Sequence, residues 1–197
     1  MLHFLDQIDR SVFLFFNSLH CTFLDPIMWQ ISGRTIWLPL YAILIWFIIR
    51  ERKWNAVITL LAVALMILLS DQLSDLIKDS VQRFRPTHNP EIASIVHVVM
   101  DPHGHEYRGG DYGFVSSHAA NMFATATFVS LFFARKWLTI AMFAWAVVVV
   151  YSRMYLGVHY PLDLLGGALL GACIGFLISK GEQLAIKKIG LYRQHKS

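Results

Sequence analysis

Long apolar runs separated by short polar segments constrain the fold of this chain more than any other feature. There are five such runs, at residues 36–49, 54–70, 119–134, 137–152 and 164–179. Each run falls short of the roughly 20 residues that cross a bilayer, but each reaches that length when polar residues at one end are included. Because 56% of the residues are hydrophobic and only 15% are charged, we predict an integral membrane protein rather than a soluble domain.

The predicted fold class is all-α, a polytopic transmembrane helical bundle with five or six spans that forms one domain over residues 1–197. The expected spans cover about 27–50, 54–77, 116–134, 137–153 and 161–180. The segment 11–24 is short for a span, so we interpret it as an interfacial amphipathic helix, with an extra span as the alternative. The last span is rich in glycine, which favours close packing against another helix.

Basic residues gather on one side of this arrangement. Ten of the 17 Lys and Arg residues fall there, namely Arg50, Arg52, Lys53, Arg135, Lys136, Lys180, Lys187, Lys188, Arg193 and Lys196. The positive-inside tendency makes that side cytoplasmic, which leaves the loop 79–115 and the turn 153–163 on the outer side. This asymmetry also explains the net charge of +4 without a nucleic-acid partner. The sequence specifies no oligomeric state.

Three segments on the outer side carry polar residues next to apolar spans. They are "KDSVQRFRP" (78–86), "GFVSSHAANMF" (113–123) and "YSRMYLGVHYPLDLLGG" (151–167). Taken singly, Lys78, Arg85 and Arg153 read as snorkelling or topology-setting cations, and His118 as an interfacial histidine. Taken together, three cations and a helix N-terminus capped by Ser116 or Ser117 describe an anion site, most naturally for phosphate.

The pair His159 and Asp163 adds chemistry to that site. A spacing of four residues brings the two side chains within hydrogen-bond reach if the chain is helical there, and Pro161 suits a first helical turn. A carboxylate that fixes a histidine tautomer makes the histidine a competent nucleophile or base, and His118 can serve as an acid. These residues predict a membrane-embedded site for phosphoryl transfer.

The three segments resemble the motifs of the type 2 phosphatidic acid phosphatase superfamily. Lysine, six residues, then Arg-Pro is met by Lys78 and Arg85-Pro86. Ser-Arg, five residues, His, three residues, Asp is met by Ser152, Arg153, His159 and Asp163. The pattern Pro-Ser-Gly-His is met in part by residues 115–118, where Val115 replaces proline and Ser117 replaces glycine.

The resemblance implies a role for each matching residue. His159 is expected to attack phosphorus, Asp163 to orient it, and His118 to protonate the leaving oxygen. The residues expected to bind phosphate are Lys78, Arg85, Ser116, Ser117 and Arg153. The family needs no metal or other cofactor, so none is expected.

The resemblance also implies a lipid phosphate substrate held in the bilayer. We expect a multi-pass protein of the bacterial inner membrane, with its active site facing the periplasm or the outside. Undecaprenyl diphosphate is the first expectation. Lipid A and phosphatidylglycerol phosphate are alternatives, as is transfer of the phosphoryl group to an acceptor other than water. A different class of function is a non-catalytic lipid-binding membrane protein.

Two further groups of polar residues leave alternatives open. His103, His105 and Glu106 invite a metal site, but their spacing matches no strong zinc pattern, so we interpret 87–112 as a solvated loop. The alternative is that this loop covers the site or selects a headgroup. Asp71 and Asp75 share one face of the second span, where they either pair with basic side chains or line a polar cavity.

Overall fold

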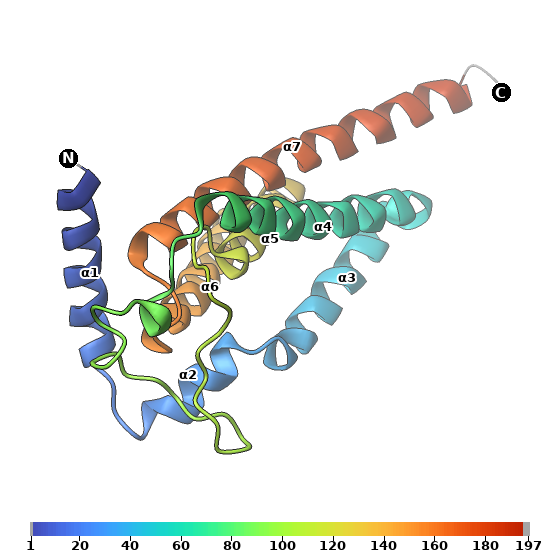
Figure 1. Cartoon of the computed structure of the whole chain (residues 1–197). Helices are drawn as coiled ribbons and strands as arrows, with labels where there is room; N and C mark the ends of the chain where they lie inside the picture. Colours follow the sequence, from blue (N-terminus) through green and yellow to red (C-terminus); the bar gives the residue numbers. More distant parts are fainter. Residues whose placement is uncertain (1, 195–197) are drawn as a thin grey trace.

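The computed structural model describes residues 2–194, and these residues form seven α-helices joined by 3₁₀ turns and loops (Figure 1). The helices are α1 (Leu2–Ser18), α2 (Leu24–Ser32), α3 (Leu38–Arg52), α4 (Ala56–Val81), α5 (Ser117–Phe133), α6 (Lys136–Tyr155) and α7 (Pro161–Gln194). The long loop between α4 and α5 contributes two isolated β-bridges. The predicted all-α class is confirmed for the described part of the chain, and Lys196 of the basic group lies outside it.

Four of the five expected spans correspond to single helices, α4 to α7. Three stretches are long and apolar enough to cross a membrane: Thr35–Val81, which contains α3 and α4, Lys136–Tyr155 and Pro161–Gly190. The 17-residue α5 packs against α4, α6 and α7. Large apolar side chains such as Ile43, Leu61 and Leu169 face outward, as expected where lipid replaces water. The number of spans stays a prediction.

The expected span 27–50 is divided into α2 and α3. The backbone of Gly33 is extended at the end of α2, and its N–H bonds to the carbonyls of Trp29 and Gln30. A 3₁₀ turn follows, and α3 then begins with Pro39 near its N-terminus, a position that proline tolerates because the first helical N–H groups have no acceptor within the helix. The break brings the end of α2 next to α6.

Helix α1 contains only the first part of the expected amphipathic segment 11–24, because it begins at Leu2 and ends at Ser18. Phe13 is completely buried and packs edge-to-face on Tyr160, at 5.4 Å between ring centroids. Phe4 and Phe15 are exposed, so apolar side chains also point away from the bundle. Interfacial placement and a sixth span both stay predictions.

A stripe of glycines lets α7 approach α5 closely. Gly167, Gly171 and Gly175 lie one turn apart and face the backbone of α5. A Cβ atom added at Gly175 would lie 2.5 Å from the carbonyl oxygen of Ala124, and one at Gly171 would overlap the backbone of Ala120. The expected close packing of the glycine-rich helix is confirmed, and it holds the N-termini of α5 and α7 together.

Replacing Gly171 with valine should therefore destabilise the bundle, by roughly 1–3 kcal/mol or more because the α5 backbone cannot move aside. Gly181 is a matched control on the same helix, since nothing lies within 4 Å of a Cβ atom added there. Thermal unfolding in detergent should show a lower midpoint for Gly171→Val than for Gly181→Val. Equal midpoints would contradict this account of the packing.

The helices bring two groups of loops to opposite ends of the bundle. At one end, Arg52 lies over the ring of Phe132 and pairs with the buried Glu182, which also accepts a hydrogen bond of 2.6 Å from Thr59. The end of α3, the end of α5 and the middle of α7 therefore meet there. The three motif segments meet at the other end.

Candidate active site

His159 and Asp163 lie together where α7 begins. Asp163 is in the first turn of the helix, which starts at Pro161 as predicted. The Nδ1 atom of His159 is 3.5 Å from Oδ2 of Asp163, and both side chains are buried. This distance is longer than an ordinary hydrogen bond, but such contacts often tighten when substrate binds. The two residues lie close together, and the hydrogen bond expected between them stays a prediction.

The other ring nitrogen of His159 faces a cation. Nη1 of Arg85 lies 2.9 Å from Nε2 of His159 and donates to the carbonyl of Val158 at 3.1 Å. The backbone N–H of Arg85 is bonded to Asp111, which fixes the loop segment that carries it. Nε2, the atom expected to attack phosphorus, therefore points to the side of the ring where the guanidinium lies.

Arg153 and Lys78 reach the same end of the bundle from α6 and α4. Arg153 is buried in the last turn of α6, where it donates to Ser32 and, at 2.8 Å, to the hydroxyl of Tyr107. Nζ of Lys78 bonds to Asp75 at 2.7 Å and also to the hydroxyl of Ser117. We call Lys78, Arg85 and Arg153 the cation cluster.

The cluster changes the protonation of its neighbours. Burial, reinforced by the three cations, lowers the pKa of His159 well below its ordinary value, so the ring is neutral and its lone pair is available. Burial and the charge of Arg153 also lower the pKa of Arg85. Three cations whose charges all act on His159 make this end of the bundle suited to binding phosphate.

The second motif forms the N-terminus of α5. Ser116 is the N-cap, as one of the two predicted alternatives had it, and its hydroxyl accepts from the N–H of Ala119 at 3.4 Å. Its own N–H bonds to the carbonyl of Asp163 at 3.0 Å, which joins the second motif to the third. Ser117 is the first helical residue and meets Lys78, and its substitution for glycine requires no unusual backbone.

An apolar cavity of about 360 Å³ begins beside this N-terminus. It lies between α3, α4 and α5. Helices α3 and α4 diverge from the turn that joins them (Figure 1). Most of its lining is apolar, including Leu44, Met66 and Phe128, whereas Ser117 and His118 contribute polar atoms. A cavity of this shape can hold an apolar chain next to the cation cluster.

A second cavity, of about 470 Å³, lies between α2, the long loop and the end of α6. Tyr107 of the loop and Arg153 line it. Both cavities share Ser32, Gly33, Arg34 and His118. The two spaces therefore adjoin at His118, one mainly apolar and the other bordered by polar side chains.

Comparison with known proteins identifies this arrangement. A sequence model described as the PAP2 superfamily matches residues 56–186, which hold all three motifs. The chain belongs to the PAP2 superfamily. The family resemblance inferred from the motifs is thus confirmed, and the protein is a hydrolase of lipid phosphates.

Individual PAP2 relatives differ in their substrates. The chain is 40% identical over 181 residues to a lipid A 4'-phosphatase of Bacteroides thetaiotaomicron, and this match covers 90% of this chain and 78% of that protein. It is 31% identical to an undecaprenyl-diphosphatase of Sulfolobus acidocaldarius, over 78% of this chain and 68% of that protein. Its fold resembles the crystal structure of a transmembrane PAP2-type phosphatidylglycerolphosphate phosphatase from Bacillus subtilis, with a TM-score of 0.69 at 24% identity, over 91% of this chain and 86% of that one.

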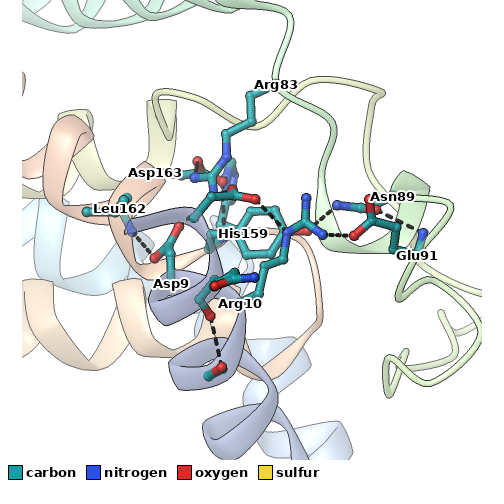
Figure 2. Close-up of polar contacts among 12 residues, drawn as sticks. Asp9, Arg10, Arg83, Asn89, Glu91, His159, Leu162 and Asp163 are labelled. Carbon is teal, nitrogen blue, oxygen red and sulfur yellow. Dashed lines mark hydrogen bonds and ion pairs between the residues drawn. The ribbon is translucent and has the colours of Figure 1, made fainter. Parts of the chain in front are cut away.

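Several residues at the PAP2 site were not predicted from the sequence. Arg83 donates to Oδ1 of Asp163 at 2.9 Å, and Tyr107 and Ser32 hold Arg153 (Figure 2 shows Arg83 and Asp163). Arg83 had a detectable signal, because it lies two residues before Arg85 and alternate residues of an extended segment point to the same side. Tyr107 and Ser32 had none, since they reach the site only through the packing of the loop and α2.

The two open groups of polar residues now have defined contacts. Asp101 accepts backbone hydrogen bonds from His103 and His105, and Glu106 pairs with Arg108. Within residues 2–194, no three His, Cys, Asp or Glu side chains are grouped as metal ligands. Asp75 meets the first alternative for the aspartates, whereas the cavity beside Asp71 is mainly apolar and not polar. Asp75 pairs with Lys78, whereas Asp71 accepts from Asn121 and lines the apolar cavity.

Proposed function

We propose that His159 is the nucleophile of the reaction. Its Nε2 attacks phosphorus in line, a P–N bond forms, and the P–O bond to the lipid breaks. His118 donates a proton to the departing lipid oxygen. Water then attacks the phosphohistidine, His118 takes a proton from it, and the P–N bond breaks to release inorganic phosphate. The neutral, buried ring of His159 and its position between Asp163 and Arg85 support this role.

The cation cluster and the N-terminus of α5 hold the transferred phosphoryl group. Lys78, Arg85 and Arg153 neutralise the charge on its equatorial oxygens, and Ser116 and Ser117 border the helix N-terminus that faces it. Asp163 keeps Nδ1 of His159 protonated, so that Nε2 carries the lone pair. No metal or other cofactor takes part in this scheme.

The apolar cavity holds the lipid tail. The position of this cavity beside Ser117 and His118 is the observation that carries the proposal, because a phosphate site for soluble esters needs no apolar space beside it. The cavity begins at Ser117 and His118 and extends between membrane-spanning helices. A lipid whose tail lies there presents its phosphate to the cation cluster, and its polar headgroup reaches the second cavity beside Tyr107 and Arg153.

A phosphorylated glycolipid of the lipid A type is the proposed substrate. The 40% identity to a lipid A 4'-phosphatase over most of both chains supports it, and the second cavity offers Arg34, Tyr107 and Arg153 as polar partners for a sugar headgroup. This corrects the ranking drawn from the motifs, which placed undecaprenyl diphosphate first. Undecaprenyl diphosphate remains the second candidate because the relative of that specificity is 31% identical.

The membrane side of the site follows from charge. Arg52 and its basic neighbours lie at the end of the bundle opposite the cation cluster. With that end in the cytoplasm, the site faces the periplasm or the outside of the cell membrane.

Purified wild-type protein in detergent should release inorganic phosphate fastest from lipid A that carries a 4'-phosphate. We expect slower release from undecaprenyl diphosphate and phosphatidylglycerol phosphate, and the slowest from p-nitrophenyl phosphate, which has no tail to fill the apolar cavity. Phosphate assays and mass spectrometry of the lipid products measure this ranking.

The same assay separates the alternatives. Phosphate found on a second lipid instead of in solution would identify a phosphotransferase. Fastest release from undecaprenyl diphosphate would replace the proposed substrate with the second candidate. Equal rates on p-nitrophenyl phosphate and the lipids would contradict the role of the apolar cavity.

A further inference from the structure

Arg83 connects the Asp163 carboxylate to helix α1. Its Nη1 donates to Oδ1 of Asp163 at 2.9 Å, and its Nη2 donates to Oδ2 of Asp9 at 2.7 Å and to Oδ1 of Asp6 at 2.9 Å. Figure 2 shows the guanidinium between Asp163 on one side and Asp9 on the other. One side chain of the long loop thus joins residues that are 74 and 80 positions away in the sequence.

The carboxylate of Asp163 depends on this contact. Asp163 is fully buried, and its Oδ2 accepts the N–H of Tyr160 at 3.0 Å on the side that faces His159. Its Oδ1 accepts from Arg83. A buried carboxylate that loses a charged partner must take up a proton or rotate to another partner. Either change alters the oxygen presented to Nδ1 of His159.

Asp9 holds Arg83 and the start of α7 at the same time. It is buried, with 3% of its surface exposed, although it lies on a helix near the chain's N-terminus. Its Oδ1 accepts the N–H of Leu162, one of the groups that have no acceptor within the first turn of α7. Its Oδ2 accepts from Arg83, so Asp9 of α1 bonds both to the arginine that contacts Asp163 and to the residue that precedes Asp163.

The guanidinium is further confined by an aromatic ring. Its central carbon lies 4.3 Å from the centroid of Tyr160, which in turn packs on Phe13 of α1. Burial lowers the pKa of Arg83, but the charge of Asp163 and the bonds to Asp9 and Asp6 outweigh burial and raise it. The side chain is therefore a fixed cation with little room to rotate.

We propose that Arg83 is the positioning residue for Asp163, and that α1 holds Arg83 in place through Asp9. The proposal rests on His159 being the nucleophile. Arg83 bonds to Oδ1 of Asp163, whereas Oδ2 faces the ring of His159. Arg85 instead faces Nε2 of His159, where the phosphate is proposed to bind. Loss of Arg83 should therefore slow attack by His159 and leave phosphate binding intact.

Steady-state kinetics of four variants test this role. Arg83→Gln should lower kcat by about 10- to 100-fold, the range seen when a partner that orients a reactive side chain is lost, with little change in KM. Arg83→Lys should recover part of the loss, because it restores a cation beside Asp163 without the forked geometry. Asp9→Asn should lower kcat by a smaller factor.

Arg10→Gln is the matched control. Arg10 lies next to Asp9 on α1 and also bonds to Asp6, but its other partner is Glu91 in the long loop rather than Asp163 (Figure 2). It should keep wild-type kcat, since it removes a comparable ion pair of α1 without reaching the carboxylate. Thermal midpoints of all variants are measured in the same detergent, and Arg83→Lys carries the test if Arg83→Gln does not fold.

Three results would overturn the inference: wild-type kcat in both Arg83 variants, a raised KM at unchanged kcat, or an equal loss in Arg10→Gln. A raised KM would place Arg83 at the phosphate instead. Failure of the proposed function looks different. In that case His159→Ala keeps near-wild-type turnover, or the wild-type protein itself releases no phosphate from any lipid.

Discussion

Replacing His159 with alanine is expected to abolish phosphate release, with a fall in turnover of roughly 10⁴-fold or more. The reason is that the proposed scheme needs a P–N bond at Nε2, and no other described ring nitrogen lies between Asp163 and Arg85. His159→Gln is a companion variant that fills more of the buried space. Turnover of lipid A 4'-phosphate is measured on protein whose helical content and elution volume match those of the wild type.

His97→Ala provides the matched control for this variant. His97 is another histidine paired with a carboxylate, at 3.0 Å from Asp25, and it stacks on His20 away from the cation cluster. Its loss should leave turnover close to that of the wild type. Near-normal turnover by His159→Ala would end the assignment of the nucleophile. Wild-type protein that is incubated with ³²P-labelled lipid and quenched in alkaline detergent should carry a label that is stable to base and lost in acid, and His159→Gln should lack it.

Asp163→Asn is expected to slow turnover by roughly 10³- to 10⁴-fold while the fold is kept. The amide is neutral, so it cannot stabilise positive charge that develops on the ring of His159 during attack. The amide also has only one acceptor oxygen, so it cannot accept from both Arg83 and Tyr160 as the two carboxylate oxygens do. Single-turnover rates with saturating enzyme report the attack step directly.

The control for this change is Asp25→Asn, which alters the carboxylate of the other pair without touching the site. It should affect stability through its bond to Tyr155 more than it affects the rate. If Asp163→Asn reacts as fast as the wild type, Asp163 does not orient the nucleophile. The role proposed for Arg83 then fails with it, whereas the assignment of His159 still stands.

Sequence reasoning was most successful where short spacings carry the chemistry. His159 lies two residues before α7 begins at Pro161, and Asp163 lies in the first turn of that helix, so the short spacing alone could predict that the two side chains lie close together. The N-cap at Ser116 was predictable for the same reason. Apolar runs located the helices because the bilayer requires helical backbone, although the division at Gly33 was not anticipated.

Reasoning from the sequence failed where a contact joins residues that are far apart in the sequence. Arg83 lies inside the first motif segment, yet nothing local says that Asp9 is its partner 74 residues away. Helix α1 was treated as a membrane-surface element, since its amphipathic pattern describes a face but not what that face covers. The proposed substrate also differs from the first expectation drawn from the motifs, because the motifs report the phosphate and not the lipid that carries it.

The amino-acid sequence by itself determined that this is a helical membrane protein with the reactive groups of a PAP2 phosphatase, because hydropathy and motif spacing act over a few turns of helix. Only the tertiary structure decided how those groups are supported. The packing of α7 on α5, the break between α2 and α3, and the contact of α1 with Arg83 place side chains that are distant in sequence around one carboxylate and one apolar cavity. Such contacts depend on how whole helices pack, which no local pattern encodes.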